Sequence, residues 1–501
     1  MSYAAMFPDT APAPSAAPPP TPPLQRALPA PVPALSQPTP APASTEDLPP
    51  LWDHQLEDIE RCLATPRAYD ASDPGTGKTR KHIEVWRRQT REQRGKVLVL
   101  ATRSILQSAW GNDIERFAPE LTYSIAWAHN RIAAFEREAD VYITNHDAAK
   151  WLAKNPRYLQ QFSGGTLVID EATAFKHRTS QRSVAVQRIA SLVTQLKLLS
   201  GTPNSNTVLD LWHQYYLIDW GTRLGKRFFS FRNATCYAEQ TGPGPEMVTW
   251  RDRPGIEQQV ADLVADITMR HRFEDCMSIP ENFVTVVPWQ LSAKLRRIYD
   301  EFQKHSIVTL EAGDVTALQA SSLKQKLLQI ASGAVYDAAH EPKLVDTSRY
   351  ELILDLVEER EHCLVAFLWV HQRDQLIAEA ERRGVSYAVL DGEASDRQRL
   401  DAVDRFQAGD IRVIFAHPQS ASHGLTLTRG TSTIWASPTL NAEHYKQFNQ
   451  RIYRGGQHRR TETVLVEAQN TIEPERYLRL QGKLDRQENF LETLKSLCTK
   501  A

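Results

Sequence analysis

Residues 72–86 read SDPGTGKTRKHIEVW, a glycine-rich turn that runs directly into a helix-like segment. Gly75 and Gly77 allow backbone amides to turn inward, and such amides, together with the first turn of a helix, bind anionic phosphate. The alternative interpretation is a flexible glycine loop that holds no ligand. The neighbouring side chains and the rest of the chain decide between the two.

Two side chains beside these glycines favour the phosphate site. Lys78 is placed to neutralise the β- and γ-phosphates of a nucleotide, and the Thr79 hydroxyl to ligate Mg²⁺. The Walker A pattern is incomplete, because Asp73 or Pro74 lies near the position of its first glycine. A second element is therefore needed to support nucleotide binding.

That element is TLVIDEATAFKHRTSQ, residues 166–181, in which an apolar strand ends at Asp170 and Glu171. Asp170 can hold Mg²⁺ through water, and Glu171 can orient and deprotonate an attacking water. A chance acidic pair is the alternative for this stretch alone. Because it follows Lys78 by about ninety residues in an α/β chain, the two stretches together predict nucleotide hydrolysis.

Short apolar runs alternate with helix-like segments on both sides of a less regular middle. Such runs suit buried parallel strands, and two series of them imply two α/β domains. Ligands of these sheets bind beyond the carboxyl ends of the strands, so the turns after the runs should carry the chemistry. The runs are 96–102, 141–145, 166–172 and 196–202 in the first series, and 363–369, 386–392, 411–417, 432–437 and 463–468 in the second.

The second series ends with QFNQRIYRGGQHRR, residues 447–460, which places Arg451 and Arg454 three residues apart on one predicted helical face. Guanidinium groups that enter from a second domain are suited to stabilise charge on a transferring γ-phosphoryl group. The alternative is a solvated basic face, which is common on helices.

Composition limits the class of protein. A chain of 501 residues is too long for one core, and its net charge of −1 excludes a global basic field, so nucleic-acid binding needs a local patch. The five cysteines form no CxxC pair, which argues against a zinc site and a disulfide framework. No apolar run reaches the roughly 18 residues of a membrane span, and we expect a cytoplasmic protein with no membrane partner.

The first 50 residues hold sixteen of the thirty prolines. Proline lacks the amide donor and fixes φ, so this stretch should be an extended, solvated arm that precedes the folded domains. A plain disordered arm and a tail that binds a protein partner both fit this composition.

The ordered motifs resemble those of a superfamily 2 helicase, and more narrowly the Swi/Snf-type DNA-dependent ATPases in the compact form found in phages and bacteria. The resemblance covers nearly everything from Leu51 to about Ala468. The narrower likeness rests on DEATAFKHRTSQRS, on LDLW after SGTP, and on the spacing from Gln447 to Gln457. The motifs are DPGTGKT (73–79), LVLATRSILQSAW (98–110), YITNHDAA (142–149), VIDEATAFK (168–176), LLSGTPNSN (198–206), HGLTLTRG (423–430) and QFNQRIYRGGQ (447–457).

The resemblance implies a role for each matching residue. Gln55 is similar to the glutamine that reads adenine, and Gly424 to a glycine that senses nucleotide and touches the DNA backbone. The implied catalytic residues are Lys78, Glu171, Arg451 and Arg454, and the implied Mg²⁺ ligands are Thr79 and Asp170. The implied nucleotide-binding residues are Gln55, Gly75, Thr76, Gly77, Lys78, Thr79, Asp170, Gly424 and Gln447. The chain departs from the family's usual pattern at Thr76 and Thr426.

The implied fold is two tandem RecA-like domains with parallel central sheets and a nucleotide cleft between them. We expect an N-terminal ATP-binding domain over 51–275, a linking helical region over 276–345 and a C-terminal helicase domain over 346–501, after the arm of residues 1–50.

The implied activity is ATP hydrolysis that drives movement on double-stranded DNA through backbone contacts, with remodelling of DNA or protein–DNA complexes. ATP and Mg²⁺ are the implied cofactors. Two alternatives stay open: a helicase that separates strands or migrates branches on DNA or RNA, and a nucleotide-dependent binding protein that is not a motor.

Overall fold

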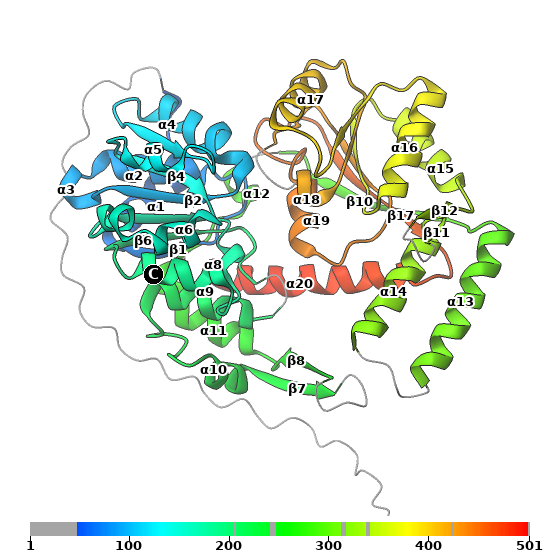
Figure 1. Cartoon of the computed structure of the whole chain (residues 1–501), viewed down its shortest axis with the longest axis horizontal. Helices are drawn as coiled ribbons and strands as arrows, with labels where there is room; N and C mark the ends of the chain where they lie inside the picture. The colour runs from blue at the N-terminus through cyan, green and yellow to red at the C-terminus, as the bar shows by residue number, and fades with distance from the viewer. Residues whose placement is uncertain are drawn as a thin grey trace, which may run out of the picture.

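The computed structural model describes residues 48–204, 207–240, 247–277, 279–311, 317–336, 341–421 and 425–498. The N-terminal arm, apart from Leu48, Pro49 and Pro50, lies outside the described residues. Two lobes, each built on a parallel sheet with helices around it, lie side by side (Figure 1). The predicted α/β class with two parallel central sheets is confirmed.

The first lobe contains a seven-stranded sheet in the order β3-β4-β2-β5-β6-β1-β9, and every neighbouring pair is parallel. Each of the four predicted runs of the first series forms a strand. Three strands were not predicted, among them β1, which leads into the glycine loop. The bounds are β1 Arg67–Asp70, β2 Val97–Ala101, β3 Tyr123–Ala126, β4 Val141–Asn145, β5 Thr166–Asp170, β6 Gln195–Leu199 and β9 Thr268–Met269.

Helices cover this sheet, and α2 begins where the sequence predicts a helix after the glycine loop. An antiparallel pair of strands, β7 and β8, stands outside the sheet next to α10 (Figure 1). The helices are α1 Asp53–Ala64, α2 Lys78–Arg88, α3 Arg91–Arg94, α4 Asn112–Phe117, α5 Arg131–Glu136, α6 Ala148–Lys154, α7 Pro156–Leu159, α8 Gln181–Ala190, α9 Leu209–Asp219, α10 Phe228–Thr235, α11 Ile256–Val264 and α12 Phe273–Cys276; the strand pair is β7 Cys236–Gln240 and β8 Val248–Asp252.

The second lobe contains a six-stranded sheet in the order β10-β17-β16-β13-β15-β14, again parallel throughout. Its runs match those predicted from the second series. The exception is β10, which pairs with β17 along eight residues although it lies in the stretch for which we predicted a linking helical region. The bounds are β10 Asn282–Trp289, β13 Cys363–Ala366, β14 Tyr387–Leu390, β15 Val413–Ala416, β16 Ser432–Trp435 and β17 Thr461–Ala468.

Helices α13 and α14 follow β10 and project from the second lobe with the short antiparallel pair β11 and β12 (Figure 1). The remaining helices pack around the second sheet. The bounds are α13 Ala293–Glu311, α14 Ala317–Ala331, β11 Ala334–Tyr336, β12 Pro342–Leu344, α15 Ser348–Glu358, α16 Val370–Arg383, α17 Asp396–Ala408, α18 Pro418–Ala421, α19 Ala442–Asn449 and α20 Glu473–Cys498.

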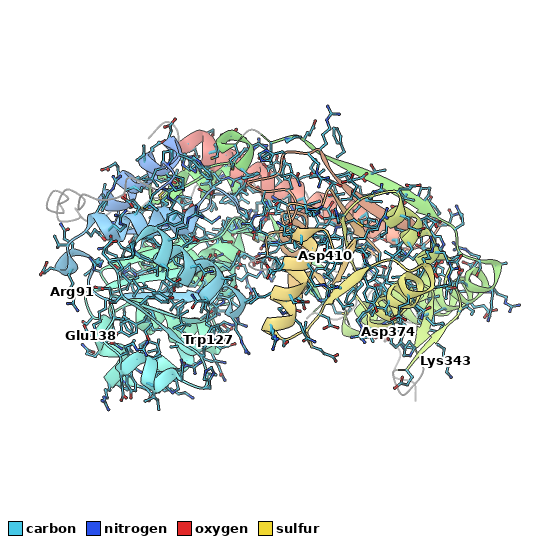
Figure 2. The ribbon with its side chains drawn as sticks, turned by 90° about the horizontal axis from the view of Figure 1, so that it is seen from above. Arg91, Trp127, Glu138, Lys343, Asp374 and Asp410 are labelled. Carbon is cyan, nitrogen blue, oxygen red and sulfur yellow. The ribbon has the colours of Figure 1, made fainter. Side chains whose placement is uncertain are left out.

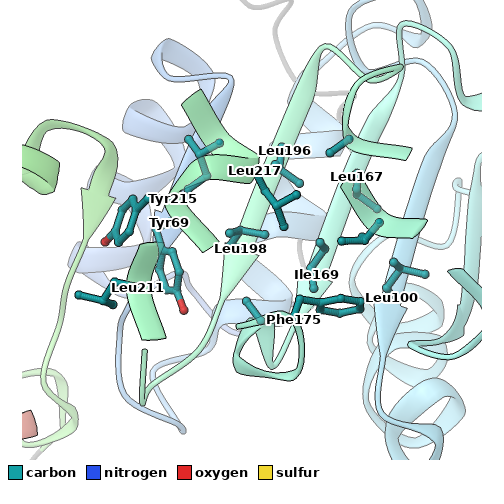
Figure 3. Close-up of a cluster of buried hydrophobic side chains, with 14 of the residues drawn as sticks. Tyr69, Leu100, Leu167, Ile169, Phe175, Leu196, Leu198, Leu211, Tyr215 and Leu217 are labelled. Carbon is teal, nitrogen blue, oxygen red and sulfur yellow. The ribbon is translucent and has the colours of Figure 1, made fainter. Parts of the chain in front are cut away.

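One part of the core of the first lobe lies between the sheet and helix α9 (Figure 3), and a second buried cluster covers the opposite face of the sheet. Leu167, Ile169 and Leu198 are fully buried on central strands, as expected for a parallel sheet with both faces covered. Tyr69 of β1 stacks on Tyr215 of α9 with ring centroids 5.3 Å apart. This packing fixes the ends of β1 and β5, from which the candidate site is built.

The last helix, α20, joins the two lobes (Figure 1). Its first turn belongs to the second lobe, where Glu473 forms a fully buried ion pair with Arg349 at 2.8 Å. Its last turns belong to the first lobe, where Phe490, Leu491 and Leu494 are completely buried in the core. Within the described residues, no helix has the length and apolar composition that a membrane crossing requires.

Candidate nucleotide site

The glycine loop connects the end of β1 to the start of α2. Gly75 and Gly77 have φ angles of +89° and +75°, a backbone region that favours glycine. A Cβ atom on Gly77 would lie 2.2 Å from Nε2 of Gln55, so the close approach of the loop to α1 also requires glycine. Lys78 donates hydrogen bonds from Nζ to the carbonyls of Ser72 at 2.7 Å and Asp73 at 2.9 Å. These contacts hold the lysine over the loop that we predict to bind phosphate.

Helix α1 positions Gln55 against this loop. The side-chain amide of Gln55 donates to the Gly77 carbonyl at 3.2 Å, and its Oε1 accepts from the Trp52 amide at 3.0 Å. Gln55 and the glycine loop therefore hold each other in position. That Gln55 reads adenine stays a prediction.

A buried ionic network supports the loop from behind. Nζ of Lys81 on α2 lies 2.7 Å from Asp70 at the end of β1 and also contacts Asp58 of α1. Burial alone lowers the pKa of Lys81, but the two carboxylates outweigh it and raise the pKa above its ordinary value. The three elements that meet at the glycine loop are thus tied together by a lysine that stays charged.

Asp170 and Glu171 lie at the tip of β5. The Trp110 indole donates to Oδ2 of Asp170 at 2.9 Å, and the Glu171 amide donates to Oδ1 at 3.0 Å. Glu171 has a φ of +52°, an uncommon conformation for a residue with a side chain and one that clusters at functional sites. Desolvation and the nearby carboxylates of Asp170 and Glu443 raise the pKa of Glu171 to about 8, against the opposing effect of Lys78 and Arg451.

Arg451 and Arg454 do not lie on a helical face, so that prediction is wrong. Helix α19 ends at Asn449, and both arginines occupy the turns that follow it. Arg451 is 6% exposed and donates from Nε to the Gln447 carbonyl at 2.7 Å. Both arginines also donate to the Leu425 carbonyl, at 3.2 Å from Arg451 and 2.8 Å from Arg454. One carbonyl therefore brings the two guanidinium groups together.

The charges of the two lobes face each other across this site. Burial and the neighbouring Arg454 lower the pKa of Arg451 to about 9, and the Glu171 carboxylate of the other lobe opposes that shift. Desolvation lowers the pKa of Lys78, opposed by carboxylates that include Glu171 and Asp170. Glu171 thus interacts electrostatically both with Lys78 of its own lobe and with Arg451 of the other lobe.

Sequence reasoning missed a contact that crosses the cleft. The Thr173 hydroxyl, just after the acidic pair, donates to Oε1 of Glu443 on α19 at 3.1 Å. The Gln447 amide donates to the same oxygen at 3.3 Å. A hydrogen-bonded chain therefore runs from the loop after β5 through Glu443 and Gln447 to Arg451. Thr173 lies within the VIDEATAFK motif, but Glu443 is 270 residues away and belongs to none of the motifs, so the sequence could not reveal the contact.

The structure gives fewer contacts for the other predicted site residues. The Thr76 hydroxyl donates to the Asp73 carbonyl at 2.8 Å, within the glycine loop. Thr79 follows Lys78 in the first turn of α2 and is partly exposed. Gly424 lies outside the described residues, directly before Leu425. The individual roles of all the predicted site residues stay predictions.

The two lobes carry the domains of an ATP-dependent motor enzyme of the helicase type, as two family matches show. Residues 71–333 match the SNF2-related domain, and residues 348–456 match the helicase conserved C-terminal domain. The chain belongs to the SNF2-related family. It carries that family's ATP-dependent motor domains and is an ATP hydrolase, as the resemblance implied.

Several known proteins are similar to the chain. Protein p41 of Acyrthosiphon pisum secondary endosymbiont phage 1 is 28% identical over 417 residues, which are 79% of this chain and 88% of the phage protein. The chromodomain-helicase-DNA-binding protein 1-like of Danio rerio is 24% identical over 83% of this chain, and an ATP-dependent helicase of Mycoplasma pneumoniae is 22% identical over 79%. The chain spans only 41% and 37% of the lengths of these two relatives. Among solved structures, the Sulfolobus solfataricus SWI2/SNF2 ATPase core in complex with dsDNA is 19% identical with a TM-score of 0.40, covering 89% of this chain and 97% of that core.

Proposed function

We propose that this protein uses ATP hydrolysis to translocate along double-stranded DNA and so remodels DNA or protein–DNA complexes. The observation that carries the proposal is the arrangement of charge across the cleft. The Thr173 hydroxyl after the acidic pair donates to Glu443 of the other lobe at 3.1 Å, and Glu171 interacts electrostatically with Arg451 of that lobe, so we expect hydrolysis to depend on the relative position of the lobes.

Each of these side chains has a distinct part in hydrolysis. Lys78 neutralises the β- and γ-phosphates, and Glu171 takes the proton of the attacking water. Arg451 and Arg454 stabilise the charge that develops on the γ-phosphoryl group. Gln55 fixes the base by its position beside the glycine loop.

The residues present also fit a Mg²⁺ ion. Among the described residues, no group of three or more His, Cys, Asp or Glu side chains could hold a metal ion by itself, which is compatible with Mg²⁺ because this ion is commonly bound by one or two protein ligands together with phosphate oxygens. Thr79 and Asp170 would hold the ion, which neutralises phosphate charge when bound. The other parts of hydrolysis, which are phosphate neutralisation, proton transfer and stabilisation of the transferring group, fall to the side chains described above.

Movement follows if each lobe grips the phosphate backbone while the cleft opens and closes. The loop after β4 is suited to transmit this motion. Nε2 of His146 in that loop lies 2.7 Å from the Asp170 carbonyl. A carbonyl oxygen can only accept a hydrogen bond, so Nε2 carries the proton. This hydrogen bond connects the loop after β4 directly to the acidic pair. On the second lobe, Leu425 connects the two arginines to the loop after α18.

The name of the Danio rerio relative includes DNA binding, which supports DNA as the partner. The Swi/Snf-type resemblance favours movement on duplex DNA without strand separation.

The test is a set of ATPase rates with duplex DNA, single-stranded DNA and RNA, each at two salt concentrations because phosphate grip is salt-sensitive. We expect duplex DNA to stimulate hydrolysis well above the other two. Equal or RNA-preferring stimulation would favour a strand-separating helicase instead. Absence of stimulation at either salt concentration would favour a nucleotide-dependent binding protein.

A further inference from the structure

A ladder of alternating arginine and aromatic side chains lies on the first lobe outside the nucleotide cleft. The guanidinium carbon of Arg178 lies 5.0 Å from the ring centroid of Phe228 and 5.1 Å from that of Phe229. The guanidinium carbon of Arg232 lies 5.0 Å from Phe229 and 3.8 Å from Trp250. We call these five side chains the arginine ladder.

Three segments that are distant in sequence build this ladder: the loop before α8, helix α10 and strand β8. Figure 1 shows α10, β7 and β8 together at the lower edge of the first lobe. Phe229 is 56% exposed, so the ladder is open to solvent along at least one side. A large exposed aromatic residue within a set of cations is the composition of a binding surface rather than of a core.

In the part of the chain that the structure describes, no ion pair offsets the positive charge of this surface. Among the residues that the structure describes, no carboxylate pairs with Arg178 or Arg232, nor with the exposed Lys226 and Arg227 that flank the ladder. The neighbouring Arg223 is the contrast, because it pairs with two aspartates at 3.0 and 2.6 Å. The buried Nε of Arg232 also has no hydrogen-bond partner among the residues with described positions.

Two acidic side chains of the adjoining strands β7 and β8 are already engaged. Glu239 of β7 pairs with Arg251 at 2.6 Å. The Asp252 carboxylate accepts from the Val208 amide at 3.2 Å. Two stacked arginines, a lysine and a further arginine therefore present net positive charge in a surface held by its own packing.

The stacking decides which part of a nucleic acid fits. Arg178 and Arg232 lie over the Phe228, Phe229 and Trp250 rings, where an unpaired base would otherwise stack. A guanidinium group stacked through its face still offers its N–H edge, which suits phosphate oxygens. Because packing already orders these arginines, less conformational freedom is lost when phosphate binds.

We propose that the arginine ladder, with Lys226 and Arg227, is a docking surface for the sugar–phosphate backbone of duplex DNA outside the cleft between the lobes. This inference rests on the proposed function, because it supplies a second, sequence-independent grip for the same motor. Such a grip would hold the duplex while the cleft contacts are released during each cycle.

The test is the salt dependence of binding to a short DNA duplex, measured with the full chain. Each phosphate contact contributes about 0.9 to the slope of log Kobs against log salt concentration. We expect the double variant Arg178→Gln/Arg232→Gln to lower the magnitude of that slope by about 2. The double variant Lys226→Gln/Arg227→Gln lies outside the stacks and should lower it by about 2 as well, even if loss of the ladder disturbs α10.

Two control arginines are matched to the ladder. Arg157 stacks on Tyr158 at 5.4 Å but faces Glu136 at 3.4 Å. Arg91 pairs with Glu138 at 2.7 Å at the outer edge of the first lobe (Figure 2). The double variant Arg157→Gln/Arg91→Gln removes equal charge and should leave the slope unchanged.

The outcomes separate this inference from the proposed function. An unchanged slope in both test variants, with duplex-stimulated hydrolysis intact in the wild type, would overturn the docking surface alone. A larger loss for single strands than for duplex would also overturn it, since it would indicate base contacts. Absence of duplex stimulation in the wild type would overturn the proposed function itself.

Discussion

At the residue scale, the backbone conformation of Glu171 gives two adjacent carboxylates different surroundings. Its positive φ turns the chain sharply after β5, while its amide bonds to the neighbouring Asp170 carboxylate. The turn therefore separates the two side chains: Asp170 is held by Trp110, and Glu171 faces the cleft. Adjacent carboxylates with different partners can take different roles.

Replacement of Glu171 by Gln tests its role as the base. The substitution keeps the shape of the side chain and removes the proton acceptor, so kcat should fall by about 10²- to 10⁴-fold while ATP affinity is kept. Steady-state kinetics and nucleotide titration measure the two quantities. Glu301→Gln, at an exposed position of α13, is the control. Near-normal turnover in Glu171→Gln would assign the base to another residue.

His213 of α9 makes stability depend on pH. Its Nδ1 donates to the Phe175 carbonyl at 2.6 Å, and its buried Nε2 has no partner among the described residues. Burial lowers its pKa to about 4, with a further lowering by Arg178 and an opposing effect of the Phe175 carbonyl. The unfolded chain then binds a proton near pH 6.5 that the folded chain excludes.

The expected result is a loss of stability on acidification. The contribution of His213 is complete above pH 6.5 and is lost as pH falls toward 4, by about 2 kcal/mol between pH 7 and 5. Urea unfolding at the two pH values measures it. His213→Gln should reduce the difference, whereas His129→Gln, at an exposed position, should not. An equal pH dependence in both variants would show that His213 is charged in the folded protein.

At the element scale, strands buried on both faces could be predicted from the sequence because they are continuous apolar runs. Strand β1, with the sequence RAYD, could not, because its polar residues are satisfied only by the tertiary structure. Arg67 donates to the carbonyls of Val193 and Ile218 at 3.0 and 2.7 Å. Strand β10 was missed for a different reason: Phe283 and Val284 are exposed on this edge strand, and no periodic βα pattern surrounds it.

The candidate site also combines residues that could be predicted from the sequence with residues that could not. Lys78, Asp170 and Glu171 were predicted because short-range motifs at strand tips place them. The residue at which α19 ends was not predicted, because it depends on contacts with residues that are not adjacent in the sequence. The Asn449 amide oxygen accepts from Thr433 at 2.8 Å and from Trp435 at 3.0 Å, so the last residue of the helix is tied to β16. The arginines then lie in a turn rather than on the helix.

The contact between Thr173 and Glu443 should matter for turnover because it joins the loop after β5 to the helix that precedes the arginines. Glu443→Ala removes the acceptor shared by Thr173 and Gln447. We expect kcat to fall about tenfold, which corresponds to about 1.4 kcal/mol, with a smaller change in KM for ATP. Glu443→Gln keeps an acceptor oxygen and should restore much of the rate.

A double-mutant cycle distinguishes positioning from general damage. Thr173→Val should add little to Glu443→Ala, because both remove one interaction. Lys446→Ala on the same helix breaks a contact with Glu488 at 3.4 Å, away from the cleft, and serves as the control. Fully additive effects, or a loss confined to KM, would contradict a positioning role.

At the scale of the whole molecule, α20 constrains how the lobes move. The buried pair Arg349–Glu473 anchors one end in the second lobe, and Leu494 with its neighbours anchors the other end in the first. Lys495 and Asp275 add an ion pair at 2.6 Å near that end. A continuous helix with both ends buried resists separation of the lobes, so opening of the cleft must bend α20 or release one end.

Two substitutions on α20 measure the strength of the first-lobe anchor. Leu494 is fully buried, so Leu494→Ala should lower the free energy of unfolding by about 2 to 5 kcal/mol. Leu478 on the same helix is 73% exposed, and Leu478→Ala should change it by less than about 0.5 kcal/mol. Urea denaturation compares the two variants.

A charged substitution tests whether this anchor also limits opening of the cleft. Phe490→Asp/Leu494→Asp buries two carboxylates unless the end of α20 leaves the first-lobe core, and release costs less than burial of unpaired charge. The lobes should then separate more widely, which small-angle scattering detects as a larger radius of gyration. Far-UV circular dichroism checks that both sheets stay folded. A folded variant with an unchanged radius would mean that contacts at the cleft itself, such as Thr173 with Glu443, hold the lobes together without α20.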